Sequence, residues 1–514
     1  MDNDKIDGII DKHRGRASSL IQVLMEIQSE NHWLPREVLE KVSAKLGVPL
    51  TEVLHIVTFY NTFSMVPEGC HETNVGTGSN CQCSGAPRIL ETLQDQACYL
   101  IGNIGKIDPK RIEDYLGLGG YSALSKALFK MTPGQVLEEI KKANLRGRGG
   151  GGFPAGLKWE TTRNAAGEEK YVIVNGHEGE PGAFMDRALF TGNPHSVLEG
   201  LIIGAYAIGA HQGFIYTRHD SPVLRENITI ALTQAEEHGM LGKNILGSGF
   251  DFNVDVHLDI GIFVSGESSA LMRSIEGKTP EPRPKYIRTS VSGIWEKPSN
   301  LNNVETWANV PLIINEGWEW YSNIGTKRSK GTKLISLSGN IVNTGVVEVP
   351  MGTTLREIVY GIGGGIPNGK RLKAIHFGGP MGGSIPDSFL DSPLDFDELA
   401  ELGAPLGAGV MFVMDEDTDM VEVARFFTDF LTTESCGKCV PCREGNRQML
   451  EILTNISEGK GREGDIELLE GLSEVMGNAS LCALGKTASG PVLSTLRYFR
   501  DEYEAKIQRK KCPV

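Results

Sequence analysis

Apolar side chains recur at helical spacing over the first part of the chain. ASSLIQVLMEIQSEN and TEVLHIVTFYNTF carry an apolar residue every three or four positions, and Pro35 can open a helix between them. The same spacing returns in DPKRIEDYLGLGGYSALSKALF and PGQVLEEIKKANL. From residue 67 to 98 the pattern gives way to a segment rich in Gly, Ser, Cys and Asn. We predict an N-terminal helical bundle over residues 1–66, followed by a loop-rich linker.

Strand-like runs then alternate with helical stretches. YVIVN (171–175), GFIYTR (213–218) and VDVHLDIGIFV (254–264) are rich in β-branched and aromatic residues. The longest apolar stretch, VLEGLIIGAYAIGA at 197–210, contains Glu199 and is too short to cross a membrane, so we predict a buried helix there. Such alternation is typical of a parallel sheet covered by helices.

The pattern changes twice more toward the C-terminus. KLISLSGNI, VVEVP and KAIHFGG, with the helix-like TTLREIVYGI among them, predict a small mixed β-grasp-like module within residues 331–386. From Val421 the chain is helix-forming to its end. A length of 514 residues corresponds to three or four modules at about 150 residues each. We predict a multidomain α/β protein with the parts 1–66, 67–98, 99–330, 331–417 and 418–514.

The net charge of the chain argues against some classes of binding partner. The 51 Lys and Arg residues against 65 Asp and Glu residues give a net charge of −14, which argues against nucleic acid or an anionic membrane as a direct partner. The opening residues, MDNDKIDGIIDKHRGR, have no apolar core of the kind found in secretory signals. We therefore expect a cytoplasmic protein whose association with a membrane, if any, runs through partner subunits.

A cluster of cysteines near the C-terminus has the spacing of a metal centre. In ESCGKCVPCREG the residues Cys436, Cys439 and Cys442 lie on one short loop, and Cys482 in SLCALG adds a fourth sulfur from a second loop. Four thiolates in this arrangement favour a [4Fe-4S] cluster. Structural zinc and inert core cysteines are the alternatives, although C-x2-C-x2-C crowds three ligands more tightly than usual zinc motifs.

A glycine-rich loop is the candidate anion site. LRGRGGGGFPAGLKW (145–159) contains a G-x-G-x-x-G spacing, but it follows a helix-like run and not a strand, so the dinucleotide-binding interpretation fails. Consecutive glycines nevertheless let backbone N–H groups converge on a phosphate, and Arg146, Arg148 and Lys158 add positive charge. The alternative is a flexible turn between domains.

Polar residues follow two of the predicted strands. His177, Glu178, Glu180 and Asp186 come after YVIVN, and Glu267 follows the predicted strand that ends at Val264. Open α/β sheets bind ligands at the carboxyl ends of their strands, although charged residues there are often only solvated. NLNNVET (300–306) offers amide side chains to a heterocycle, and its Asn residues are equally suited to cap a helix.

These motifs together resemble a known family. IEDYLGLGGYSALSKAL, LRGRGGGGFPAGLKW, VNGHEGEPGAFMDR, NNVET, ESCGKCVPCREG and SLCALG resemble the NADH-oxidising flavoprotein subunit of respiratory complex I. They also resemble the diaphorase subunits of NAD-linked formate dehydrogenases and hydrogenases. The resemblance covers roughly residues 100–500. It implies an FMN-binding Rossmann-like domain, a ubiquitin-like (β-grasp) domain and a C-terminal helical bundle that holds a [4Fe-4S] cluster.

The resemblance also implies site residues, by motif position. The implied FMN contacts are Gly147, Arg148, Gly149, Lys158, Asn175, Glu178, Gly266, Glu267, Asn302, Asn303 and Thr306. Glu180 is the implied catalytic residue beside the nicotinamide, and Phe153, Lys285 and Arg288 complete a nicotinamide site. Cys436, Cys439, Cys442 and Cys482 are the implied ligands of the cluster.

The first hundred residues resemble the companion thioredoxin-like [2Fe-2S] subunit of the same complexes. The match keeps Cys81 but has Gly76 in place of the first cysteine, and the second half of that fold is absent. Two interpretations stay open: a vestigial docking module, or a metal site in which Cys70, Cys81 and Cys83 combine with a ligand from a partner.

The nicotinamide region departs from the family pattern. His177 stands where the family has an Asp, Ser268-Ser269 where it has Glu-Thr, and Thr161 where it has an aromatic residue. Residues 286–289, Tyr-Ile-Arg-Thr, replace a Pro-Pro-Phe-Pro segment. Losing stacking aromatics is expected to weaken or redesign the nicotinamide site. Arg288 could compensate by stacking or by binding a phosphate, as in an NADP site, or could clamp a different partner.

The predicted function is that of an oxidoreductase subunit. It passes electrons between NADH or NADPH and one-electron iron–sulfur carriers through FMN. The alternative is a relay or bifurcation subunit of a larger anaerobic complex, such as class II benzoyl-CoA reductase, with an altered or lost nicotinamide site. The expected partners are a separate thioredoxin-like [2Fe-2S] subunit and further iron–sulfur or catalytic subunits.

Overall fold

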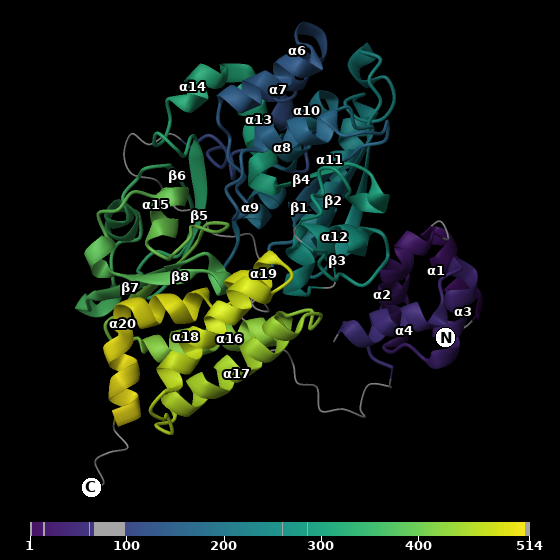
Figure 1. The fold of residues 1–514 in the computed structure, drawn as a ribbon. Coiled ribbons are helices and arrows are strands. Elements are labelled where there is room, and N and C mark those ends of the chain that lie inside the picture. Colours follow the sequence, from purple (N-terminus) through teal and green to yellow (C-terminus); the bar gives the residue numbers. More distant parts are fainter. Residues whose placement is uncertain are drawn as a thin grey trace.

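The computed structural model describes residues 3–13, 16–60, 62–65, 98–259, 261–284 and 286–508. Within these ranges the chain forms four regions of helices and sheets (Figure 1). The predicted linker at 67–98 lies almost wholly outside the described residues, and so do Cys70, Cys81, Cys83 and Lys285.

The N-terminal region is a small helical bundle, as the apolar spacing predicts. Its helices are α1 (Asn3–Lys12), α2 (Leu20–Asn31), α3 (Arg36–Leu46) and α4 (Leu50–Phe59). Leu20, Ile27, Leu39 and Ile56 are fully buried and form its core. The bundle lies beside β3 and α12 of the next region (Figure 1), where the Gln22 amide and the His257 ring are 2.8 Å apart.

The central region is built on a four-stranded parallel sheet. Its strands are β1 (Tyr171–Gly176), β2 (Gln212–Arg218), β3 (Asn253–Asp259) and β4 (Ser299–Asn303), in the order β3-β2-β1-β4. This confirms the predicted parallel sheet. Val174 of β1 lies between Ile215 and Asn302. The carboxyl ends of all four strands therefore meet at one edge of the sheet.

One sequence prediction about this sheet is wrong in detail, and one strand was not predicted. The strand predicted to run to Val264 ends at Asp259, and Phe263–Gly266 is a short 3-10 helix. The cause is local: the Asp259 carboxylate accepts the Gly261 N–H at 2.7 Å, and Gly261 turns the chain with φ +94°. The segment SNLNN, whose last two residues open NNVET, forms β4, a strand that the apolar pattern did not predict.

Helices cover both faces of the parallel sheet. The predicted apolar helix is α10 (Pro194–Ile208), and it packs against α13 (Val304–Glu316). A β-carbon at Gly200 would lie 1.9 Å from the Trp307 carbonyl oxygen, so these two helices touch backbone to backbone. The buried Glu199 accepts hydrogen bonds from the Tyr115 hydroxyl at 2.6 Å and from two backbone N–H groups. The other helices of this region are α5 (Ile112–Gly117), α6 (Ser122–Lys130), α7 (Pro133–Lys142), α8 (Ala155–Asn164), α9 (Met185–Gly192), α11 (Pro222–Glu237), α12 (Ser268–Ile275) and α14 (Trp318–Ser322).

The third region is a five-stranded mixed sheet. Its strands are β5 (Thr332–Gly339), β6 (Gly345–Pro350), β7 (Leu372–Phe377), β8 (Gly383–Pro386) and β9 (Val410–Asp415), in the order β6-β5-β9-β7-β8. β5 and β9 are parallel, and the other pairs are antiparallel. A short helix, α15 (Phe396–Glu401), precedes β9. The segment predicted as a helix at TTLREIVYGI contains a π-helix over Glu357–Ile362.

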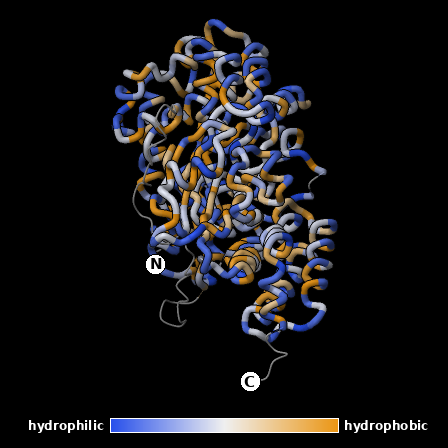
Figure 2. Tube along the Cα trace, turned by 90° about the vertical axis from the view of Figure 1, so that its left-hand side faces the viewer, coloured by the Kyte–Doolittle hydropathy of each residue, from blue (hydrophilic) through white to orange (hydrophobic). Residues whose placement is uncertain are grey.

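Helices complete the chain from residue 420 onward. They are α16 (Met420–Glu434), α17 (Val440–Ser457), α18 (Asp465–Ala479), α19 (Ala483–Thr487) and α20 (Gly490–Gln508). Hydrophilic residues are interspersed with hydrophobic ones along the helices (Figure 2). In the part of the chain that the structure describes, we find no helix with the length and apolar character needed to span a bilayer.

Candidate functional site

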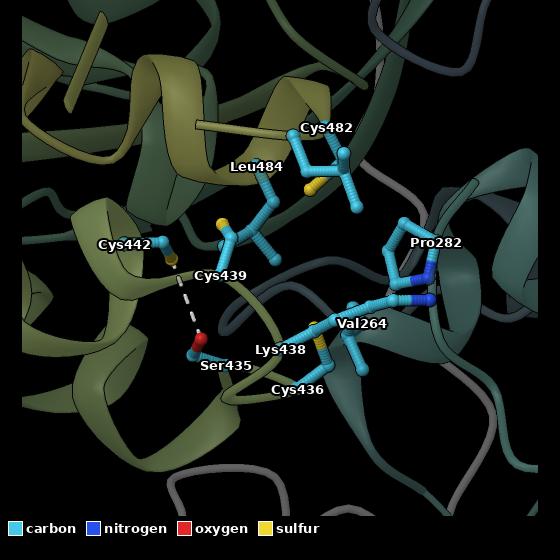
Figure 3. A pocket seen from close by; sticks show the side chains of 10 residues that line it. Val264, Pro282, Ser435, Cys436, Lys438, Cys439, Cys442, Cys482 and Leu484 are labelled. Carbon is cyan, nitrogen blue, oxygen red and sulfur yellow. Dashed lines mark hydrogen bonds between the residues drawn. The ribbon is translucent and has the colours of Figure 1, made fainter. Parts of the chain in front are cut away.

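The four cysteines singled out in the sequence line one pocket. Cys436 and Cys439 come from the loop between α16 and α17, Cys442 from the first turn of α17, and Cys482 from the residue that precedes α19 (Figure 3). Two short loops therefore direct four thiols toward a common space. Among the described residues, no three His, Cys, Asp or Glu side chains converge as they would around a single metal ion.

The protein surroundings of these thiols are partly polar. The Ser435 hydroxyl lies 3.3 Å from the Cys442 sulfur, and the Asn446 amide donates to the same sulfur at 3.5 Å. Burial raises the pKa of the Cys436 and Cys442 thiols, and it raises the pKa of Cys482 to about 11. A buried thiolate is the form that binds metal, and a cationic cluster offsets the cost of burying its charge.

The cysteine pocket borders the parallel sheet region. Val264 and Pro282, which follow β3, line the pocket together with the cysteines (Figure 3). The backbone N–H of Phe263 donates to the Glu434 carboxylate at 2.8 Å, and Lys438 pairs with Glu281 at 3.0 Å. The loop after β3 is thus held directly against the loop that carries Cys436 and Cys439.

The glycine-rich loop lies between α7 and α8. Its preceding element is a helix, as predicted from the sequence. A β-carbon at Gly149 would lie 2.9 Å from the Asn303 side chain, so the loop backbone closely approaches the end of β4. The Arg148 N–H donates to the Thr306 hydroxyl at 2.8 Å, which ties the same loop to the start of α13.

The two arginines of this loop are held by protein groups. Arg146 forms a bidentate pair with Asp397, at 2.8 and 3.1 Å. Arg148 is fully buried and donates to the Tyr321 hydroxyl at 3.1 Å and to the Lys330 carbonyl at 2.6 Å. Its Nε and Nη1 atoms are buried without a hydrogen-bond partner. The sequence motif could not show that both guanidinium groups would be turned toward other segments.

Lys158, in the first turn of α8, contacts β4. Its Nζ donates to the Leu301 carbonyl oxygen. Burial lowers the pKa of Lys158 to about 8. A carboxylate or phosphate beside this amine would favour its charged form and raise the pKa again.

Side chains after β1, β3 and β4 meet at the carboxyl edge of the sheet. The Asn175 amide donates to the Gly266 carbonyl at 3.0 Å, and the Asn303 amide donates to Asp186 at 2.6 Å. Asn302, the next residue back in β4, is buried, and with its amide turned it accepts from Trp159 Nε1 at 2.7 Å. Asn303 also accepts the Glu305 N–H at 3.0 Å, so its predicted helix-capping role is confirmed.

Glu178 and Glu267 bind helix N-termini. Glu178 accepts the N–H groups of Asp186 and Arg187 at 2.8 and 3.1 Å, in the first turn of α9. Glu267 caps α12 by accepting the N–H groups of Ser269 and Ala270 at 2.9 and 3.1 Å. Both carboxylates therefore fix the backbone of the loops that carry them.

Glu180 lies between the two sheets. A β-carbon at Gly379, before β8, would lie 2.9 Å from its Oε2 atom, and that oxygen is buried without a hydrogen-bond partner. Burial raises the pKa of Glu180 to about 7. A carboxyl group in this state exchanges its proton near neutral pH.

The other predicted nicotinamide residues are on the surface or outside the described residues. The Phe153 side chain is 57% exposed, Arg288 is exposed, and Lys285 is not among the described residues. Tyr286, in the segment that departs from the family pattern, is 84% exposed.

Asp259 is a buried residue of this region that sequence reasoning missed. Its carboxylate lies 3.0 Å from His177 Nε2 and accepts the Tyr216 hydroxyl at 2.7 Å. The available signal was a charged residue at a predicted strand's interior position, in VDVHLD, next to the departure at His177.

Four families of known domains match the chain. Residues 140–312 match the Nuo51 FMN-binding domain, and residues 422–506 match the NADH-ubiquinone oxidoreductase-F iron-sulfur binding region. Residues 6–106 match the thioredoxin-like [2Fe-2S] ferredoxin family, and residues 334–384 match the SLBB domain. With the geometry above, these matches define the class of protein: a flavoprotein with an iron–sulfur centre.

Relatives and solved structures identify the family. The NADP-reducing hydrogenase subunit HndC of Solidesulfovibrio fructosivorans is 49% identical over 412 residues, which cover 80% of this chain and 84% of that protein. An NADH-quinone oxidoreductase subunit of Rhizobium meliloti is 42% identical, over 80% of this chain and 98% of that protein. A crystal structure of an NAD+-reducing [NiFe]-hydrogenase in the H2-reduced state is similar with a TM-score of 0.80 at 26% identity, covering 96% of this chain and 94% of that chain.

The chain therefore belongs to the family of flavin and iron–sulfur subunits of NADH-quinone oxidoreductases and related hydrogenases. It is an oxidoreductase subunit of the NADH dehydrogenase type, and its cofactors are FMN and a [4Fe-4S] cluster. These relatives do not favour the alternative of a relay subunit of the benzoyl-CoA reductase type.

Proposed function

We propose that this chain collects electrons from a nicotinamide nucleotide at the carboxyl edge of its parallel sheet and passes them to the cysteine pocket. The observation that supports this most directly is the shared loop after β3. Gly266 and Glu267 lie at the sheet edge, and Val264, two residues before Gly266, lines the cysteine pocket. A flavin at that edge and a cluster in that pocket are then neighbours.

The residues at the sheet edge fit FMN. The backbone of Gly149 approaches Asn303 closely, and residue 149 permits this approach because it has no side chain. The buried Oε2 atom of Glu180, which has no hydrogen-bond partner, suits a polar ligand. Lys158 supplies a cation for the phosphate. When bound, FMN accepts two electrons as a hydride and releases them one at a time.

The other predicted FMN contacts hold the protein backbone in place around the site. Asn175, Asn303 and Thr306 hold the loop backbones in register through their hydrogen bonds. Glu178 and Glu267 do the same through the helix N-termini that they cap. We assign to the same site Gly147, Gly266 and Asn302, which lie in the loops and strand that these bonds connect.

The donor set of the pocket fits a [4Fe-4S] cluster. Each iron of such a cluster takes one thiolate, and Cys436, Cys439, Cys442 and Cys482 are the four soft ligands that surround the pocket. Val264, Pro282 and Leu484 add apolar side chains to the pocket lining (Figure 3). The amide of Asn446 and the hydroxyl of Ser435 hydrogen-bond to sulfur and tune the cluster's potential.

Glu180 holds a proton at its unpartnered Oε2 atom near neutral pH. We place the nicotinamide next to this carboxyl, with the exposed Phe153 and Arg288 at the outer rim of the site. Lys285, outside the described residues, stays part of the predicted set. The exposed Arg288 gives an extra phosphate a binding partner, which makes NADPH a substrate to test beside NADH.

The division of the chain and its partners are part of the same proposal. The parallel sheet region is the Rossmann-like FMN domain, the mixed sheet is ubiquitin-like, and the last helices form the cluster-binding bundle. The N-terminal bundle docks a separate thioredoxin-like [2Fe-2S] subunit, which with additional iron–sulfur or catalytic subunits receives the electrons. The chain associates with a membrane only through such partners.

Cofactor content of the anaerobically purified chain tests the two sites separately. We expect about one FMN and about four irons per chain in the wild type. Cys482→Ser removes the iron and keeps the flavin, whereas Lys158→Gln lowers the flavin content and keeps the iron. Cys98→Ser and Lys170→Gln are the matched controls, because Cys98 is remote in sequence from the pocket loops and the Lys170 amine also donates to a backbone carbonyl.

Three results of this experiment would count against the proposal. Iron that survives Cys482→Ser contradicts the cysteine assignment, and flavin that survives Lys158→Gln at wild-type affinity contradicts the phosphate site. A wild-type chain without flavin contradicts the function itself. About two further irons per chain would show a [2Fe-2S] cluster in the N-terminal segment.

A further inference from the structure

A buried histidine–aspartate pair lies beneath the proposed flavin site. His177 is 2% exposed and Asp259 is fully buried, and 3.0 Å separates His177 Nε2 from an Asp259 oxygen. His177 follows β1 and Asp259 ends β3, so the pair joins the two loops that carry Glu178 and Gly266. No other side chain in the described residues is hydrogen-bonded to the His177 ring.

Asp259 fixes one side of the imidazole. Its carboxylate also accepts the Tyr216 hydroxyl at 2.7 Å and the Gly261 N–H at 2.7 Å. Burial opposes the charge on this carboxylate, but its hydrogen bonds to His177, Tyr216 and Gly261 outweigh burial and lower the pKa of Asp259. An ionised carboxylate only accepts hydrogen bonds, so His177 Nε2 must carry a proton.

The other ring nitrogen faces the two flavin loops. A β-carbon at Gly266 would lie 2.8 Å from His177 Nδ1, and a β-carbon at Gly179 would lie 2.8 Å from the same atom. The Nδ1 edge of the ring therefore lies between the backbones of the loops that contain Glu178 and Glu267. A second proton on Nδ1 would place a positive charge against the backbone that we propose binds the flavin.

The charged and titratable groups around this ring come from several elements. Asp259 and Tyr216 contact the pair directly, and Tyr216 stacks between the rings of His177 and His257 with centroids 6.3 and 5.8 Å away. Glu434 at the end of α16 acts electrostatically on both His177 and Asp259. Arg218 at the end of β2 and Tyr60 after α4 act on Asp259, and Glu178 in the same loop acts on Arg218. Asp259 is the one carboxylate bonded to the ring among the described residues.

We propose that His177 balances charge at the flavin site by taking up one proton on Nδ1 when the flavin is reduced. A hydride from the nicotinamide delivers two electrons and one proton, so the flavin gains one negative charge, and the proton on Nδ1 comes from solvent. A negative charge nearby favours the protonated imidazole, and Asp259 keeps the ring oriented for this exchange. Asp259 is the positioning residue of the pair. The charge-balancing role of His177 rests on the proposed function.

Proton uptake during flavin reduction tests the proposal. The midpoint potential of the bound flavin is measured by potentiometric titration at intervals between about pH 5 and 8, the range in which histidine titrates. The pH slope of the potential gives the protons taken up per flavin. We expect His177→Gln to take up fewer protons than the wild type over part of this range, by as much as one per flavin. His211→Gln, an exposed histidine at the opposite end of β2, is the matched control and keeps the wild-type slope.

Asp259→Asn provides the second variant, because it keeps the imidazole but removes its carboxylate. The pH range in which flavin reduction takes up the additional proton is expected to move lower by about one pH unit or more. The proposal is overturned if the flavin potential of His177→Gln has the wild-type pH slope at every pH. It is also overturned if the pH range of proton uptake does not change in Asp259→Asn. It is also overturned if neither variant holds FMN, since the pair would then serve binding alone. A wild-type chain that binds no flavin would instead contradict the proposed function.

Discussion

At the residue scale, Glu180 makes the stability of the flavin-free protein depend on pH. Its pKa is raised to about 7 from a normal value of 4.5 because the carboxyl group is buried. The folded protein therefore binds this proton more tightly than the unfolded chain does. Between pH 4.5 and about 7 the free energy of unfolding falls as pH rises, and the stabilising contribution is lost above that range.

Glu180→Gln removes this dependence. We expect the variant to be more stable than the wild type at pH 8 by about 1–3 kcal/mol, with little difference at pH 4.5. Urea unfolding of the flavin-free proteins at the two pH values measures the effect. Glu316→Gln, at an exposed position in α13, should show no such difference. An equal change for Glu180→Gln at both pH values would show that burial does not control this carboxyl group.

The sequence located the polar residues of the sheet edge but not what they contact. Glu178 and Glu267 could be placed after strands because their positions follow β-rich runs. That each caps a helix could not be seen, since a cap depends on where the next helix begins in space. Arg146 and Arg148 show the same limit, because their partners Asp397 and Lys330 lie more than 180 residues away.

At the scale of elements, the contact between α10 and α13 depends on the absence of a side chain at Gly200. The added β-carbon of Gly200→Ala would lie 1.9 Å from the Trp307 carbonyl oxygen, so the helices must separate. We expect a loss of stability of about 1–3 kcal/mol or more. Gly134→Ala, in α7, meets no atom within 4 Å and should stabilise the protein by about 0.4–1 kcal/mol.

Thermal or urea unfolding of the two alanine variants measures these opposite effects. A Gly200→Ala variant as stable as the wild type would mean that α10 and α13 do not pack as closely as the structure shows.

Elements with a clear pattern of apolar residues could be predicted from the sequence, and elements without such a pattern could not. The helices of residues 17–64 and the strand β1 follow the expected spacing closely. β4 was missed because the segment SNLNN carries amide side chains where a strand normally has β-branched residues. β3 ends early because Asp259 bonds to the Gly261 N–H, a single local contact that a hydrophobic pattern does not encode.

At the scale of the whole molecule, the N-terminal bundle packs against the FMN-binding region through α2, α4 and the residues before α2. A β-carbon at Gly277, after α12, would lie 2.4 Å from the Ala17 carbonyl oxygen, and Thr279 lies 3.2 Å from the His55 ring. Gly277→Ala should therefore weaken the packing of the N-terminal bundle against the central region and leave the core of the bundle unchanged. Hydrogen exchange is expected to increase in α2 and α4 and to stay unchanged in β1 and β2.

Gly105→Ala is the control for this prediction. Gly105 and Gly277 have similar positive φ angles, +83° and +77°, so both substitutions strain the backbone, but a β-carbon at Gly105 meets nothing within 4 Å. Equal exchange in α2 for the two variants would contradict the docking of the bundle seen in the structure.

The order of regions along the chain could be anticipated from motifs, whereas their mutual contacts could not. The cysteine spacing predicted a common pocket from residues 436–482 alone. That Val264 and Pro282 would complete this pocket follows only from the packing of the helical region against the loop after β3. This contact is also what brings the two proposed cofactor sites together.

The most direct test of the proposed function is anaerobic reduction of the purified, flavin-loaded chain by NADH and then by NADPH, with dithionite as the reference. Flavin absorbance follows the first step, and electron paramagnetic resonance of the iron–sulfur centre follows the second. We predict that at least one nucleotide bleaches the flavin rapidly and that the cluster signal appears with it. If dithionite reduces the flavin while neither nucleotide does, or if the cluster stays oxidised beside a reduced flavin, the proposed function is wrong.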